Sequence, residues 1–155
     1  MRLIEGLDAL LALDLCATYG NAPPSQSVVA VGVFDGVHLG HQRLLHQLLE
    51  MSSELQGMPT VVTFANHPDQ LLHGKAPPLI CSVPQRLRLL RRAGVLRLVS
   101  LQFEPRLQNM TVRQFAEELL VARLLGEFGL TPVTQTKVHA TDAPPSRASK
   151  YITGA

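Results

Sequence analysis

Residues 32–41 read Gly-Val-Phe-Asp-Gly-Val-His-Leu-Gly-His and come directly after the apolar run Val28 to Val31. The glycines allow a tight turn and a close approach of another group to the backbone. Beyond this stretch, apolar residues recur at helical spacing and polar residues occupy the other face. The apolar positions are Leu44, Leu45, Leu48 and Leu49. A strand, a glycine turn and an amphipathic helix aim the amides of a helix N-terminus at an anion, so we predict a phosphate site here.

Two histidines three residues apart, His38 and His41, stand at the mouth of the expected helix. Imidazoles placed there can donate hydrogen bonds to phosphate oxygens and stabilise the charge that builds up as phosphorus is attacked, with no covalent role. Capping or solvated histidines are the alternative interpretation. Asp35 also has two open interpretations. It orients a substrate, or it caps the glycine turn, as aspartate does in many turns that hold no ligand.

The nine residues from Phe34 to Gln42 resemble the signature of the bacterial FAD synthetase (FMN adenylyltransferase) family, which belongs to the nucleotidylyltransferases with a His-x-x-His motif. The likeness continues in order through residues 59–64, 67–68, 85–90, 94–103 and 110–125. A lone His-x-x-His pair is weak evidence, whereas the whole string in strand, turn and helix context is specific. The resemblance implies attack of the FMN phosphate on the α-phosphorus of ATP, which gives FAD and pyrophosphate, with Mg²⁺ carried on the ATP.

The same resemblance assigns expected roles to particular residues. His38 and His41 are the expected catalytic pair, binding the β and γ phosphates as they depart. His67 and Pro68 match the family's flavin-side turn, and a solvated loop histidine is the alternative for His67. No residue is expected to hold a metal of its own. The expected ATP and phosphate contacts are Gly32, Phe34, Asp35, Gly36, Gly40, Ser149 and Lys150.

The C-terminal part departs from the family pattern. One family strand that follows Leu125 is lacking, and residues 131–138 are predicted to form the last sheet strand. Unless that last strand pairs in its place, backbone groups at the edge of the active site would lack partners. In the motif that contacts triphosphate, Thr153 stands where the family has an arginine, and Lys150 or Arg147 could supply a cation from nearby.

Strands and helices are expected to alternate along the chain, which predicts an α/β fold with a Rossmann-like parallel sheet, crossover helices and nucleotidylyltransferase topology. Thr111 and Gln114 form a capping box at the start of the last helix. Residues 66–84, rich in proline, are predicted to be irregular, and the arginines of the helix before residue 93 are predicted to form a solvated face. The predicted strands are 27–34, 60–65 and 97–103, and the predicted helices are 40–55, 84–93 and 111–124.

Composition is consistent with this interpretation. With 155 residues, 46% hydrophobic and 17% charged, the chain can bury one core, so a single domain over 1–155 is expected, without the riboflavin kinase domain that often follows in the family. A net charge of +2 and few aromatic residues argue against nucleic acid as a partner, and no segment is long enough to span a bilayer. Cys16 and Cys81 lack metal-ligand spacing and are expected to be free thiols in a reducing cytoplasm.

Two other functions stay open. A degenerate or truncated homologue would bind nucleotide without turnover, and the missing strand and arginine motivate that hypothesis. A nucleotidylyltransferase with another phosphorylated acceptor is the second, although Gly36-Val37 resembles the flavin type rather than the cytidylyltransferases, which tend to have bulky residues there. The oligomeric state stays open.

Overall fold

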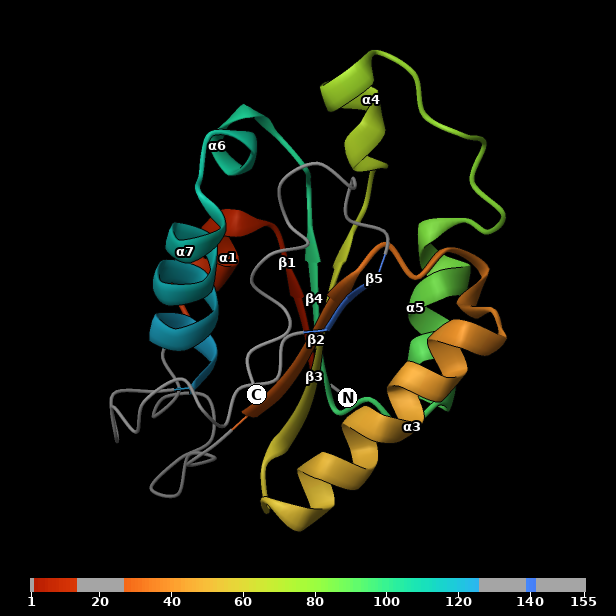
Figure 1. Ribbon diagram of the computed structural model, residues 1–155, viewed down its shortest axis with the longest axis vertical. Helices are drawn as coiled ribbons and strands as arrows, with labels where there is room; N and C mark the ends of the chain where they lie inside the picture. The colour runs from red at the N-terminus through yellow and green to blue at the C-terminus, as the bar shows by residue number, and fades with distance from the viewer. Residues whose placement is uncertain (1, 14–26, 126–138, 142–155) are drawn as a thin grey trace.

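The computed structural model describes residues 2–13, 27–125 and 139–141. Their strands form one parallel sheet in the order β1-β4-β3-β2-β5 (Figure 1). The strands are β1 (Arg2–Glu5), β2 (Ser27–Gly32), β3 (Met58–Phe64), β4 (Arg97–Leu101) and β5 (His139–Thr141). The α/β fold with crossover helices is therefore confirmed.

Helices cover both faces of the sheet (Figure 1). On one side lie α3 (Leu39–Glu54) and α5 (Val83–Arg92). On the other lie α1 (Leu7–Leu11), α6 (Pro105–Gln108) and α7 (Val112–Gln114), which continues as the π-helical segment η2 (Phe115–Leu125). A further helix, α4 (Pro68–His73), follows β3 near the top of the view in Figure 1.

Two apolar cores result from the two-residue period of the strands. In β2, Val28 and Ala30 join the core beneath α3 and α5, whereas Val29 and Val31 join the core beneath α1 and η2. All six residues of β2 are buried, as expected of a parallel strand covered on both faces. Burial on both faces fixes the register, because a slip of one residue would exchange the two sets of side chains.

The predicted elements agree with the structure to within a few residues, with one exception. Residues 66–84 were predicted to be irregular, which is wrong for α4: His67 caps this helix, Pro68 occupies its first turn and Gly74 ends it with a φ of 70°. The N-terminal leucine-rich stretch divides into β1 and α1. The capping box of Thr111 with Gln114 is confirmed, with hydrogen bonds of 2.9 and 3.1 Å.

The short strand β5 pairs with the edge of β2 that faces away from β3. Ala30, Val31 and Gly32 pair with residues 139–141 of β5, so the edge that the sequence left unpaired has a partner. The predicted last strand, 131–138, lies outside the described residues, and the strand seen begins one residue after it. Within residues 2–13, 27–125 and 139–141, no helix is long and apolar enough to cross a membrane.

A buried arginine joins the start of β4 to the starts of β2 and β3 and to the end of η2. Arg97, at the start of β4, is 0% exposed. Its Nε donates to Thr60 Oγ1 at 2.9 Å and its Nη2 to the Leu124 carbonyl at 2.8 Å and to the Ser27 hydroxyl. Ser27 Oγ in turn donates to the Leu124 carbonyl at 2.6 Å. The network ties β2, β3 and η2 to β4, on the side of the sheet opposite the carboxyl ends of the strands.

Replacing this arginine tests the network. Arg97→Met keeps the apolar stem but removes the donors to Thr60 and Leu124, and we expect the free energy of unfolding to fall by about 3 kcal/mol. Urea denaturation followed by circular dichroism measures the change. Arg91→Met, at an exposed position of α5, is the matched control and is expected to stay within about 0.5 kcal/mol of the parent. A loss below 1 kcal/mol in Arg97→Met would contradict the assigned role.

Candidate functional site

The candidate site lies at the carboxyl ends of the parallel strands, where ligands of open α/β sheets bind. The chain leaves β2 at Gly32 and passes through a short 3₁₀ turn, η1 (Asp35–Val37), into α3. The next strand, β3, ends close by and leads into α4 (Figure 1). The site is thus built from connections, with the sheet fixing where each one starts.

The turn between β2 and α3 has an unusual backbone. Phe34, Gly36 and Val37 have φ values of 54°, 69° and 43°. Positive φ is uncommon for non-glycine residues and is a real outlier for a β-branched valine, with a cost of about 1–3 kcal/mol per residue. A Cβ at Gly36 would also lie 3.1 Å from Ile80 Cγ2, so the exposed Ile80 side chain would have to shift to make room for it. Such strain persists only where other contacts hold it.

The side chain of Asp35 supplies those contacts. Its carboxylate accepts hydrogen bonds from Ile80 N at 2.6 Å and Cys81 N at 3.0 Å, and from the Cys81 thiol at 3.4 Å. In return, Gly36 N donates to Cys81 Sγ at 3.2 Å. These contacts agree with the interpretation of Asp35 as the residue that caps the turn.

The same contacts set the ionisation of Asp35. Burial raises the pKa of this carboxyl, but hydrogen bonds from the amides of Ile80 and Cys81, the Cys81 thiol and the nearby charge of Arg86 outweigh it. The pKa of Asp35 is therefore below its ordinary value of 3.8. The carboxylate is ionised at neutral pH, as its acceptor role requires.

The two histidines lie together but differ in exposure. His38 is the exposed N-cap of α3, and its Nδ1 accepts from His41 N at 3.4 Å. The His41 ring is only 1% exposed, stacks on the His38 ring at 3.6 Å between centroids, and lies 5.1 Å from the Phe34 ring. A Cβ at Gly40 would come within 3.2 Å of His38 Cε1, so this glycine makes room for the ring. The structure thus brings Phe34, His38, Gly40 and His41 together at the start of α3.

Arg86 is a site residue that the sequence analysis missed. It was predicted to lie on a solvated face with Arg88, Arg91 and Arg92, and this is wrong for Arg86, which is 0% exposed, although the other three are exposed. Its Nη1 donates to the Phe64 carbonyl at 2.6 Å, and its Nη2 lies 3.9 Å from Asp35 Oδ1. The available signal was its spacing of four from the buried Leu90, which places both on one helix face.

The expected flavin-side residues have local structural roles. His67 Nδ1 accepts from Asp69 N at 3.2 Å and caps α4, and Pro68 is buried in the first turn of that helix. Beside them, Asn66 exchanges two hydrogen bonds with the backbone of Phe103, at 2.8 and 2.6 Å. Asn66 therefore joins the ends of β3 and β4, a role that the sequence did not indicate.

Some expected site residues cannot be placed. Ser149 and Lys150, with Arg147 and Thr153, lie outside the described residues. Among the residues that are described, no group of three or more His, Cys, Asp or Glu side chains could hold a metal ion. Cys81, the described cysteine, is free, as predicted.

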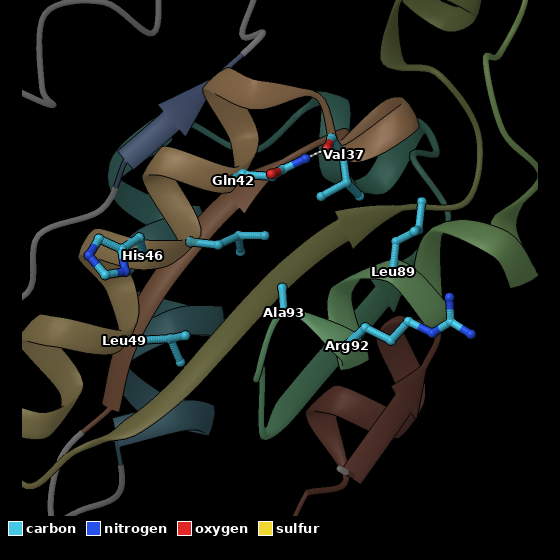
Figure 2. Close-up of a pocket in the computed structure, with 8 residues that line it drawn as sticks. Val37, Gln42, His46, Leu49, Leu89, Arg92 and Ala93 are labelled. Carbon is cyan, nitrogen blue, oxygen red and sulfur yellow. Dashed lines mark hydrogen bonds between the residues drawn. The ribbon is translucent and has the colours of Figure 1, made fainter.

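A groove of about 370 Å³ runs between α3 and α5 behind the turn (Figure 2). Gln42 Nε2 donates to the Val37 carbonyl at 3.0 Å at one end of it, and neither His38 nor His41 lines it. The histidine pair therefore lies outside this groove. The groove is lined by Val37, Gln42, Leu45, His46, Leu49, Leu89, Arg92 and Ala93.

A family model and several curated relatives identify the family of this chain. The family model of FAD synthetase matches residues 21–127. The chain is 32% identical over 129 residues to the bifunctional riboflavin kinase/FMN adenylyltransferase of Escherichia coli K12, covering 83% of this chain and 38% of that protein. Relatives of the same name from Pseudomonas fluorescens and Bacillus subtilis are 34% and 28% identical, over 61% and 63% of this chain and 30% and 31% of theirs. The chain thus spans less than two fifths of the length of these curated relatives.

A solved structure has the same fold. The crystal structure of a macrolide-efflux protein from Streptococcus pneumoniae aligns with a TM-score of 0.62 and 26% identity, covering 81% of this chain and 46% of that chain.

The Asp35 contacts predict a specific pH dependence. Because the folded-state pKa of Asp35 is lowered, its contribution to stability is complete above pH 3.8 and is lost as the pH falls through the lower folded-state value. We expect Asp35→Asn to lower the free energy of unfolding by about 1–3 kcal/mol at pH 7. Asparagine has a single acceptor oxygen, so it can replace only one of the two carboxylate oxygens that accept from Ile80 N and Cys81 N. Below pH 3.8 the difference in the free energy of unfolding between Asp35→Asn and the parent should become smaller.

Urea denaturation from pH 7 to about pH 2.5, below the ordinary aspartate pKa, measures that gap. Asp8→Asn is the control, because the Asp8 side chain is 97% exposed, and no comparable gap or narrowing is expected for it. A difference between Asp35→Asn and the parent that stays constant over the whole pH range would contradict the role of the carboxylate.

Proposed function

The chain belongs to the FAD synthetase family, and we propose that it is an FMN adenylyltransferase, which transfers AMP from ATP to FMN to give FAD and pyrophosphate. The observation that carries the proposal is the stacked pair His38 and His41 at the N-terminus of α3, within the matched region and at the carboxyl edge of the parallel sheet. We take residues 1–155 as one adenylyltransferase domain and place it in the reducing cytoplasm, where thiols such as Cys81 stay free.

In the proposed reaction an oxygen of the FMN phosphate forms a bond to the α-phosphorus of ATP, and the bond from that phosphorus to the bridging oxygen breaks. Pyrophosphate leaves with the electron pair of the broken bond. Such a transfer depends on positioning and on electrostatic stabilisation of the phosphate oxygens more than on covalent catalysis. The residues around α3 have to supply both.

His38 is the group best placed to do so. Because its Nδ1 accepts from His41 N, the neutral ring carries its proton on Nε2, which can donate to a phosphate oxygen. A helix leaves its first amides without an intrahelical acceptor, so the amides of Leu39 and Gly40 are further donors for the departing phosphates. His41 is 1% exposed beneath the His38 ring, so its contact with a phosphate requires that ring to move aside.

The turn between β2 and α3, called the phosphate turn below, is shaped in this proposal by Gly32, Phe34, Asp35 and Gly36. Their side chains do not themselves bind ATP. Asp35 in particular uses both carboxylate oxygens on the amides of Ile80 and Cys81. We retain Ser149 and Lys150 as proposed triphosphate contacts, and His67 with Pro68 as the flavin-side turn.

Mg²⁺ enters the proposal as part of the substrate. Magnesium commonly keeps several waters and binds through substrate phosphates with one or two carboxylates. The described residues offer no cluster of three acidic, histidine or cysteine ligands, and the Asp35 oxygens are occupied by backbone amides. We therefore assign no residue to the metal and no step to it.

Incubation of the purified protein with FMN, ATP and Mg²⁺, followed by chromatography of FAD, tests the proposed function. We expect FAD from the parent, and a kcat about 10²–10³-fold lower in His38→Ala, the loss typical of one missing donor to a developing charge. His46→Ala is the matched control, because His46 is exposed on the same helix, where its Nε2 lies 3.2 Å from Glu50 Oε1. Its kcat should stay within about twofold of the parent.

The outcomes separate the alternatives. No FAD from the parent, with ATP binding intact by calorimetry, would replace the proposal by a nucleotide-binding homologue without turnover. FAD formed equally well by His38→Ala and the parent would overturn the role of the histidine. Replacement of FMN by other phosphate monoesters tests the acceptor, and faster turnover with one of them would reject flavin specificity.

A further inference from the structure

Arg86 connects its own helix to two other parts of the chain, a sheet strand and the turn that precedes the histidine pair. It belongs to α5, its Nη1 donates to the carbonyl of Phe64 at the end of β3 at 2.6 Å, and its Nη2 lies 3.9 Å from Oδ1 of Asp35 in the phosphate turn. That same oxygen accepts from Cys81 N at 3.0 Å. One buried cation is thus placed between the turn, a sheet strand and the helix that follows Cys81.

The segment between Asp35's partners and Arg86 is short and firmly held. Ser82 and Gln85 form a capping box at the start of α5, with Ser82 N donating to Gln85 Oε1 at 2.9 Å and Gln85 N to Ser82 Oγ at 3.4 Å. Residues 80–86 therefore contact the turn at one end, through the amides of Ile80 and Cys81, and at the other through the guanidinium of Arg86.

Stability alone does not account for a charge in this place. Arg86 is 0% exposed, and among the described residues its Nε and Nη2 have no hydrogen-bond partner. Burial of a guanidinium costs several kcal/mol, and one hydrogen bond with an ion pair at 3.9 Å offsets that cost poorly. An apolar side chain would fill the space at least as well, so the charge points to a geometric role.

We propose that Arg86 is a positioning residue, which holds the Asp35 carboxylate and, through it, the strained turn in the conformation that presents His38. For its effect on catalysis this inference rests on the proposed adenylyltransferase function. Its effect on the turn does not depend on that function and can be measured separately.

Reaction of Cys81 with the thiol reagent DTNB reports on the turn. The Cys81 sulfur accepts from Gly36 N at 3.2 Å and donates to Asp35 Oδ1 at 3.4 Å, so labelling requires these contacts to open. In a Cys16→Ser background the signal comes from Cys81 alone. We expect Arg86→Met to label about tenfold faster than the parent under native conditions, because one holding contact of the carboxylate is lost.

Arg88→Met is the matched control, since Arg88 is exposed on the same helix, and its labelling should stay within about twofold of the parent. Asp35→Asn is expected to speed labelling as well, and the double variant with Arg86→Met should be no faster than the faster single variant, because both act on one contact. Additive effects, or equal rates in Arg86→Met and Arg88→Met, would overturn the proposal.

Arg86→Lys is the second variant, to be used if circular dichroism shows that Arg86→Met does not fold. A lysine keeps the charge but lacks the planar fork that reaches Phe64 and Asp35 together, so Arg86→Lys should label about threefold faster. A rate equal to that of the parent would overturn the proposal.

Steady-state kinetics tests the consequence for catalysis. We expect kcat of Arg86→Met to fall about 10–100-fold with KM for FMN within about twofold, and Arg86→Lys to recover part of kcat. A fall in kcat no larger than that of Arg88→Met would overturn the catalytic part. A parent that makes no FAD would count against the proposed function instead, while the Cys81 labelling still decides the role of Arg86.

Discussion

The carboxylate of Asp35 is the contact on which the candidate site depends. It accepts from two consecutive amides, Ile80 and Cys81, and so fastens the loop before α5 to the turn after β2. The turn has positive φ at Phe34, Gly36 and Val37, a conformation that the chain would leave if it were not held. Stabilisation comes from across the fold, since 45 residues separate the partners Asp35 and Ile80.

The sheet and its main helices could be predicted because their causes are local and periodic. The run from Val28 to Val31 is apolar at every position, which is typical of a strand covered on both faces, and leucines from 44 to 49 recur at helical spacing. The irregular stretch 66–84 concealed α4, since the short helix depends on one histidine cap and one proline rather than on an apolar face. The pairing of β1 with β4 is a long-range contact that periodicity cannot reveal.

The site divides in the same way. The strand, turn and helix around His38 and His41 follow from a string of ten residues, and the structure places them as that string indicates. The contacts of Arg86 and Asn66 could not be predicted, because their partners, the carbonyl of Phe64 and the backbone of Phe103, are distant in sequence and involve no side-chain pattern. Sequence spacing indicates which face of a helix a residue occupies, but tertiary contacts decide whether that face meets solvent.

The cap of α3 limits what His38 can do with protons. The lone pair on Nδ1 already accepts from His41 N, so a proton placed there would remove the side-chain cap of the helix. His38 can therefore give a hydrogen bond from Nε2 but is poorly suited to act as a base. A site of this kind favours a nucleophile that arrives already ionised, as a phosphate monoester does, over an alcohol that has to be deprotonated first.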